Sequence, residues 1–221
     1  MKTTIRELRK LILESVSRTL VKDIKSAFYK HIKDNDRTKL DKLLPTLLDL
    51  QEKGELPELL NVGDHEYAYR VIDVNTEKQL KDILGITKFD KEKYGTKRGG
   101  VLKPVDGVVS SWTVNPRSLV YSCFFCIVKK PILMVFKART KNKKNRFLGN
   151  PDRLAGTLEV GDGYSLERET LGIGDIQYDK VVYGIKREDQ SLEGLAMDLI
   201  NKIHELDPSE LTNDYYFPEK L

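Results

Sequence analysis

Apolar residues at helical spacing run through the first 60 residues of the chain. They recur every three or four positions in two groups: Ile5, Leu8, Leu11, Ile12, Val16 and Leu20, then Ile24, Phe28 and Ile32. Polar residues at Asn35, Asp36 and Thr38 mark a break, and a further helical pattern that Pro45 interrupts follows it. We therefore expect helices here, with no catalytic group among them.

From about Tyr67 the apolar period shortens toward the two-residue alternation of strands. Strands are predicted for the segments EYAYRVIDV, GVVSSWTV, KKPILMVFKART, YSLERETLG and IQYDKVVYGIK. A short helix is predicted for TEKQLKDIL, and a turn-rich stretch is predicted for KEKYGTKRGGVLKPVDG. Either a packed helix or a buried strand fits the segment PRSLVYSCFFCIV. Helices followed by a strand-rich half predict an α+β protein.

The segment SLEGLAMDLINKIHEL predicts a last helix. It begins at a serine, spaces its leucines and isoleucines at helical intervals, and ends near Asp207 and Pro208. We divide the chain into an N-terminal helical region packing on the core (1–60), a core (61–190), and a C-terminal helix with an aromatic tail (191–221).

Composition indicates a soluble globular protein. The chain has 221 residues, of which 33% are charged, and no apolar run approaches the ~20 residues of a membrane span. Charges also interrupt the apolar residues at its start, where a signal peptide would have an unbroken apolar centre. We expect a cytoplasmic protein with no membrane partner.

Positive charge is concentrated between Lys129 and Arg146. This block holds eight Lys or Arg and no acid, although the net charge of the chain is only +4. Such a block attracts phosphates, either of a dinucleotide or of a nucleic acid. The alternative, which we favour for KNKKNR alone, is a solvated lysine-rich loop.

Two cysteines, Cys123 and Cys126, stand in an apolar run with no second pair and no nearby histidine. Free cysteine is usually buried, so we interpret them as core thiols. We predict no metal site.

The strongest candidate chemistry lies at Glu167 and Glu169. Residues two apart on a strand leave the same face, and two close carboxylates disfavour simultaneous ionisation unless something supports them, which often marks a site. A Glu-x-Glu pair on the wet face of a strand is nevertheless common, so the pair alone decides nothing.

Three elements in order strengthen this interpretation: Tyr69-Arg70 on the first strand, Ser111-Trp112-Thr113 ending a later strand, and Tyr164 three residues before the Glu-x-Glu pair. With the apolar strand PILMVFKA between the last two, residues 60 to 190 resemble the R-S-E class of ADP-ribosyltransferases. This class includes clostridial exoenzymes, arginine-specific ecto-transferases and bacteriophage enzymes. The resemblance implies a core of two small, mainly antiparallel sheets around an NAD cleft.

The resemblance also implies a role for each residue. Glu169 would be the central catalytic carboxylate, Ser111 would hold its rotamer, and Glu167 would bind and deprotonate the acceptor. Arg70 would hold the diphosphate of NAD, with Ser111, Trp112 and Thr113 forming the rest of the cofactor site. Tyr164 would contact the acceptor. Trp112 departs from the usual Ser-Thr-Ser pattern, and its other interpretation is core packing.

We therefore expect a mono-ADP-ribosyltransferase that cleaves NAD and transfers ADP-ribose to a macromolecule, most readily to arginine in a protein. NAD would be a co-substrate, and the size of the chain suits a bacteriophage or bacterial effector. The alternatives are an NAD glycohydrolase, a transferase acting on nucleic acid bound by the 129–146 block, and a basic α+β interaction protein without catalysis. The last alternative requires Arg70, Ser111 and Glu169 to lie far apart, whereas a transferase needs their side chains to line one cleft.

Overall fold

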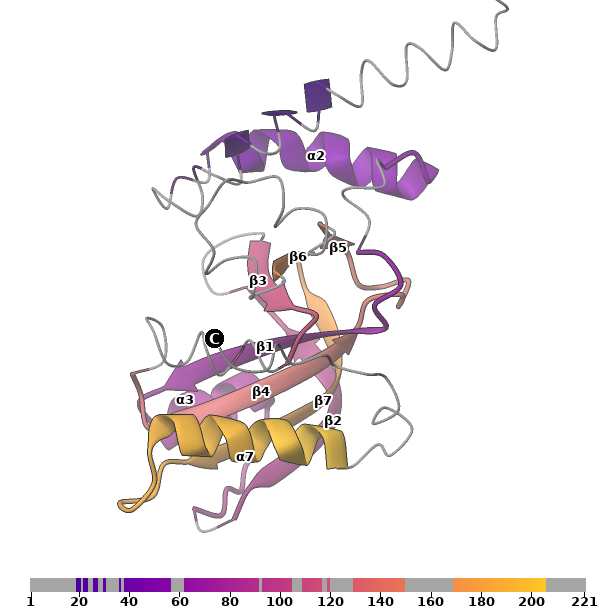
Figure 1. The fold of residues 1–221 in the computed structure, drawn as a ribbon. Coiled ribbons are helices and arrows are strands. Elements are labelled where there is room, and N and C mark those ends of the chain that lie inside the picture. The colour runs from indigo at the N-terminus through magenta and orange to yellow at the C-terminus, as the bar shows by residue number, and fades with distance from the viewer. Residues whose placement is uncertain are drawn as a thin grey trace, which may run out of the picture.

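The protein is an α+β molecule built on a curved antiparallel sheet (Figure 1). The computed structural model describes residues 38–56, 62–91, 93–104, 109–116, 119, 129–149 and 169–205, and single positions between 19 and 36. Within these residues the strands are β1 (Tyr67–Val74), β2 (Gly95–Leu102), β3 (Val109–Thr113), β4 (Ile132–Arg139), β5 (Phe147–Leu148), β6 (Glu169–Ile173) and β7 (Ile176–Ile185). They lie in the order β2-β7-β4-β1-β3-β6-β5. The expected fold class is confirmed.

Strand β2 corrects a prediction, because its glycine-rich sequence indicated turns. Its glycines instead make room for tyrosines of the neighbouring strand β7. A Cβ atom on Gly95 would lie 2.2 Å from the ring of Tyr183, and one on Gly100 would lie 2.2 Å from the hydroxyl oxygen of Tyr178. The glycines therefore allow aromatic rings to pack over an edge strand.

The expected pair of small sheets is replaced by one sheet that is joined narrowly at its middle. Strands β1 and β4 share eight register pairs from Tyr67 to Val74, whereas β1 and β3 share the single pair Tyr69 and Thr113. In Figure 1 the group β3, β6 and β5 stands at a steep angle to β1 and β4. The sheet thus bends sharply where β1 meets β3.

Helices cover both faces of the sheet. Helix α3 (Glu77–Leu84) packs Leu80 and Leu84 on one face, in the same core cluster as Phe136 and Trp112. Helix α7 (Leu192–Glu205) packs on the opposite face, over β4 and β7. We call these the α3 face and the α7 face.

The short helix α3 is closed at both ends by its own sequence. Thr76 accepts the N–H of Gln79 at 3.3 Å, and the Gln79 side chain accepts the N–H of Thr76 at 3.2 Å. Gly85 then ends the helix in the left-handed conformation, with φ of 61°. Local signals therefore explain why the predicted helix forms.

Helix α2 (Thr38–Lys53) continues through Pro45, which the sequence pattern treated as an interruption. Pro45 is exposed, while Leu40, Leu44 and Leu47 are buried in one cluster with Leu171 of β6. This burial offsets the backbone hydrogen bond that proline removes. Described positions between 19 and 30 are helical as well.

No helix in the described part of the chain is long and apolar enough to cross a membrane.

Candidate functional site

The strands that carry the candidate residues are neighbours in the sheet. Strand β1 bears Arg70, β3 bears Ser111, Trp112 and Thr113, and β6 begins at Glu169; their order is β1-β3-β6. Thr113 is the register partner of Tyr69 on one side and of Glu169 on the other. The fold thus brings together segments about 40 and 100 residues apart in sequence, as the three strand ranges show.

The positions Ser111, Thr113 and Glu169 belong to one face of the sheet. Residues directly opposite in an antiparallel pair share a face, and residues alternate along a strand. Tyr69, the register partner of Thr113, packs against α7, so this is the α7 face. Leu171 is the register partner of Ser111 and packs against α2 on the same face. Ser111 is exposed on β3, between the part of the sheet under α7 and the part under α2.

Ser110 and Trp112 occupy the α3 face, as expected from alternation. Ser110 is 6% and Trp112 is 2% exposed. The Trp112 ring packs edge-on against Phe147, with ring centroids 5.5 Å apart. Trp112 is therefore a core residue in the described structure.

The Thr113 hydroxyl serves the turn after β3. It donates to the carbonyl of Asn115 at 3.1 Å and accepts the N–H of Asn115 at 3.0 Å. Thr113 is also buried, so its hydroxyl stabilises the end of the strand. On this face of β3 the exposed residue is Ser111.

Arg70 lies on the α3 face, opposite Ser111 and Thr113. Its neighbours at alternate positions, Ala68 and Ile72, belong to the cluster that packs with α3, and its register partner on β4 is Phe136. The Nη1 atom is buried without a hydrogen-bond partner among the described residues. Burial lowers the pKa of the guanidinium to about 10, which leaves it charged at neutral pH.

Replacing Arg70 by methionine is expected to stabilise the protein by roughly 1 kcal/mol, because a buried, unpaired polar group costs about that much. Urea denaturation measures the effect, and the exposed Arg98→Met change is the control and should be close to neutral. A loss of stability in Arg70→Met would show instead that the guanidinium has a stabilising partner.

The remaining candidates are described in part or not at all. Tyr164 and Glu167 lie outside the described residues, as do Cys123 and Cys126. Glu169 is located by its backbone pairing with Thr113.

A row of polar residues that the sequence pattern did not predict crosses the α7 face. Through successive register partners it runs Lys180, Lys137, Tyr69, Thr113, Glu169. Lys137 is 2% and Lys180 is 6% exposed. The sequence signal for this row is that each of two apolar strands, β4 and β7, carries a lysine at a position that alternation turns inward.

The cations of this row lie under the carboxyl end of α7. The Lys180 Nζ atom donates to the carbonyl of Ile203 at 2.5 Å, and the Lys137 Nζ atom lies 3.9 Å from the centre of the Tyr67 ring. His204 packs on Tyr69, with ring centroids 5.5 Å apart. Positive charge is favourable at a helix C-terminus, so these groups anchor α7 beside the candidate site.

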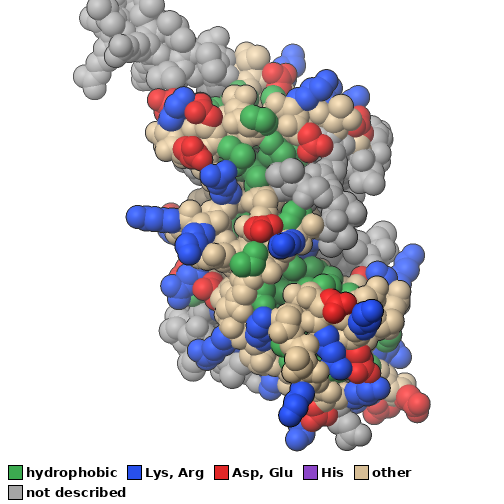
Figure 2. All heavy atoms as spheres, turned by 180° about the vertical axis from the view of Figure 1, so that it is seen from behind, with side chains coloured by type: hydrophobic (Ala, Val, Ile, Leu, Met, Phe, Trp, Pro, Cys, Tyr) green, Lys and Arg blue, Asp and Glu red, His purple; other side chains and the backbone are tan. Residues whose placement is uncertain are grey.

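Most of the basic block 129–146 is neutralised or buried. Four of its cations form ion pairs: Lys130 with Asp73, Arg139 with Asp179, Lys141 with Asp64 and Arg146 with Glu52. On the face seen in Figure 2, coloured Lys and Arg side chains are interspersed with Asp and Glu. The fold therefore weakens the phosphate-attracting surface that the sequence suggested.

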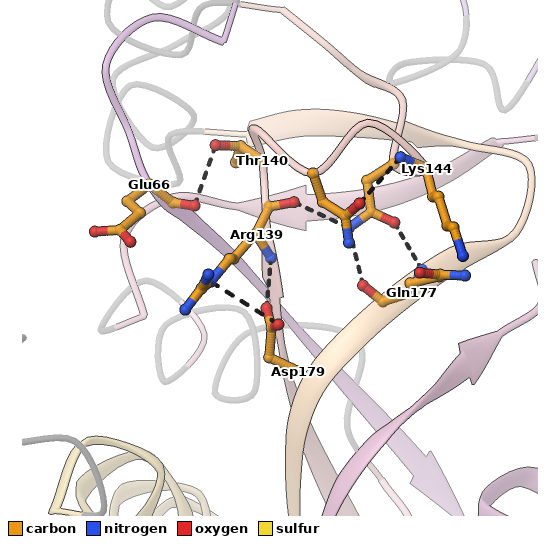
Figure 3. Close-up of polar contacts among 8 residues, drawn as sticks. Glu66, Arg139, Thr140, Lys144, Gln177 and Asp179 are labelled. Carbon is orange, nitrogen blue, oxygen red and sulfur yellow. Dashed lines mark hydrogen bonds and ion pairs between the residues drawn. The ribbon is translucent and has the colours of Figure 1, made fainter.

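The turn within this block is held rigidly at its base (Figure 3). Asn145 is 7% exposed; its amide donates to the carbonyls of Arg139 and Gln177, both at 2.9 Å, and its oxygen accepts the N–H of Gln177 at 2.7 Å. Asp179 accepts the N–H of Arg139 at 2.9 Å.

Asn145→Ala is expected to lower the free energy of unfolding by roughly 2 kcal/mol, since it leaves three backbone groups without their partner. Thermal denaturation should show a fall of several degrees. Asn142→Ala, in the same turn with one hydrogen bond to Lys144, is the control and should cost clearly less. Equal effects of the two changes would contradict this role for Asn145.

The described residues contain no group of three or more His, Cys, Asp or Glu side chains that could hold a metal ion. Comparison of the chain with protein-family models, with curated proteins and with solved structures gave no match.

Proposed function

We propose that the protein is a mono-ADP-ribosyltransferase, which cleaves NAD at the nicotinamide–ribose bond and transfers ADP-ribose to a macromolecule. One observation carries the proposal: Glu169 begins the strand next to β3 as the register partner of Thr113, on the face where Ser111 is exposed. Residues that resemble the serine and glutamate elements of R-S-E transferases are thus adjacent in space.

The chemistry of the reaction suits these groups. Cleavage of the glycosidic bond of NAD develops positive charge on the ribose, as in glycoside hydrolysis, and a nearby carboxylate stabilises that charge. Glu169 supplies this carboxylate. Ser111 is the next residue on the same face of β3 after Thr113, the register partner of Glu169, and it donates a hydrogen bond that orients the carboxylate. Glu167 binds the acceptor and accepts its proton.

The fit of NAD to the described residues is partial. Ser111 and the position of Glu169 fit the nicotinamide–ribose end of the co-substrate. Thr113 and Trp112 are buried, so their part in the cofactor site would be to support the strand that carries Ser111. Arg70 does not share their face, so its proposed contact with the diphosphate is supported only by its buried Nη1 atom, which has no partner among the described residues.

The sharp bend of the sheet supports an ADP-ribosyltransferase-like fold as part of this proposal. The β1–β3 join consists of one register pair, so β3, β6 and β5 form a nearly separate layer beside β1, β4, β7 and β2. A division of this kind resembles two small sheets flanking a cleft.

Among the acceptors, a protein arginine is favoured over a nucleic acid. The Glu167-x-Glu169 pattern resembles that of arginine-specific transferases, with Tyr164 contacting the acceptor protein. Ion pairs at Arg139, Lys141 and Arg146 reduce the charge available to bind a phosphate backbone.

The proposal is tested by incubating the purified protein with NAD labelled in the adenylate phosphate and a cell lysate. We expect label on a discrete protein, absent with Glu169→Ala. Nicotinamide release without labelling would indicate a glycohydrolase, and label on nucleic acid would move the acceptor to that class. No NAD turnover with any acceptor would refute both enzymatic functions and leave the interaction protein.

A further inference from the structure

Behind the candidate site lie two linked, buried hydrogen bonds, one within β3 and one from β3 to β6. The indole Nε1 of Trp112 donates to the Ser110 hydroxyl at 2.8 Å, and this hydroxyl donates to the carbonyl of Gly172 at 3.3 Å. Ser110 and Gly172 are register partners. All these groups lie on the α3 face, one residue from Ser111.

Close packing reinforces the hydrogen bonds. A Cβ atom on Gly172 would lie 2.6 Å from Trp112 Nε1 and 3.1 Å from the side chain of Ile176. Only glycine therefore lets the indole lie flat enough over β6 to reach Ser110. On the same side, the Thr170 hydroxyl donates to the Leu148 carbonyl at 2.9 Å and ties β6 to β5.

The register of β3 on β6 determines which face Glu169 occupies. A slip of one residue would move every side chain of β6 to the opposite face. It would also separate the buried Ser110 hydroxyl from the Gly172 carbonyl, which costs ~1–3 kcal/mol, and bring a larger residue of β6 to the place where Gly172 makes room for Trp112. The Ser110–Gly172 hydrogen bond and the packing of Trp112 on Gly172 thus penalise the register that would take Glu169 away from Ser111.

We propose that Ser110, Trp112 and Gly172 form a register lock, and that they are positioning residues for the candidate site. The lock holds Glu169 opposite Thr113 from the far side of the sheet and touches no substrate. Its effect on catalysis rests on the proposed function, but its effect on register does not.

Register is measured directly with paired cysteines at positions 113 and 169. Thr113→Cys with Glu169→Cys is oxidised and the disulfide is identified by mass spectrometry, which also separates it from any bond to Cys123 or Cys126. We expect the 113–169 disulfide in the parent chain, a yield several-fold lower after Ser110→Ala, and recovery with Ser110→Thr, which keeps the hydroxyl. Ser111→Ala, on the other face, is the matched control and should leave the yield unchanged.

Trp112 gives a second readout, because it is the only tryptophan in the chain. Ser110→Ala and Gly172→Ala should shift its emission and increase its quenching by acrylamide, while Ser110→Thr should not. An unchanged disulfide yield in a folded Ser110→Ala protein would overturn the lock, whatever the quenching shows. If Ser110→Ala does not fold, a folded Ser110→Thr protein that lacks the disulfide would overturn it equally.

Activity separates the lock from the proposed function. If the protein cleaves NAD, Ser110→Ala should lower kcat about 10-fold or more with little change in KM for NAD, and Ser110→Thr should restore it. A full kcat in a Ser110→Ala protein with low disulfide yield would overturn the positioning role. Absence of NAD cleavage by the parent chain would refute the function and leave the disulfide and fluorescence tests of the lock intact.

Discussion

Replacing Glu169 by glutamine is expected to lower the rate of nicotinamide release from NAD by roughly 100- to 1,000-fold, the usual effect of removing one group that stabilises transition-state charge. Glutamine keeps the size of the side chain and removes the negative charge that would face the ribosyl cation. The release of nicotinamide by the purified protein, followed by chromatography, measures this loss.

Glu167→Gln is the matched control, because it removes the same charge two residues away. It should retain most of the nicotinamide release and lose transfer to arginine, since Glu167 is assigned to the acceptor. If both changes reduce release equally, the division of roles between the two carboxylates is wrong. If Glu169→Gln releases nicotinamide at the parent rate, Glu169 is not the catalytic carboxylate.

The second large effect concerns the packing of α2 on the strand of Glu169. Leu44→Asp is expected to lower the free energy of unfolding by roughly 3–5 kcal/mol, because it removes a buried leucine and places a carboxylate among apolar side chains. Leu44 is 4% exposed and packs in one cluster with Leu171 and Ile173 of β6. Urea denaturation measures the loss.

Thr46→Asp provides the control on the exposed side of the same helix. It adds the same charge and should change stability by less than about 0.5 kcal/mol. A small and equal effect of the two changes would contradict the packing of α2 on β6. It would also contradict the support that α2 gives to β6, the strand that begins at Glu169.

Period and local capping were sufficient to predict most elements from the sequence. Alternation predicted β1, β4 and β7, and helical spacing predicted α7. The capping box at Thr76 explains why α3 begins where it does. These features depend on residues that are close together in the sequence, so they can be recognised from the sequence alone.

The errors concern contacts between distant segments. The glycines of β2 indicated turns because nothing in the sequence shows that Tyr178 and Tyr183 pack over them. Pro45 indicated an interruption of the helix, because nothing in the sequence shows that Leu44 packs in one cluster with Leu171. The ion pairs that neutralise Lys141 and Arg146 come from acids about 80 and 90 residues away.

For the same reason, the sequence indicated which strands carry the candidate residues but not which way each residue faces. Strand alternation explains why Ser111 and Ser110 lie on opposite faces, and the strands that carry the ordered motifs are neighbours in the sheet. The sequence could not show that Arg70 lies on the other face, because that depends on the register of β1 against β3 at Tyr69 and Thr113. The sequence also could not show that Lys137 and Lys180 of the polar row are buried, because their burial depends on the packing of α7 over β4 and β7.

The most direct test of the central claim is a crystal structure of the protein with a non-hydrolysable NAD analogue. We predict that the nicotinamide riboside lies on the α7 face beside Ser111, with a Glu169 carboxylate oxygen within hydrogen-bond distance of both the ribose and the Ser111 hydroxyl. An analogue bound away from these residues, or Glu169 on the α3 face, would contradict the account.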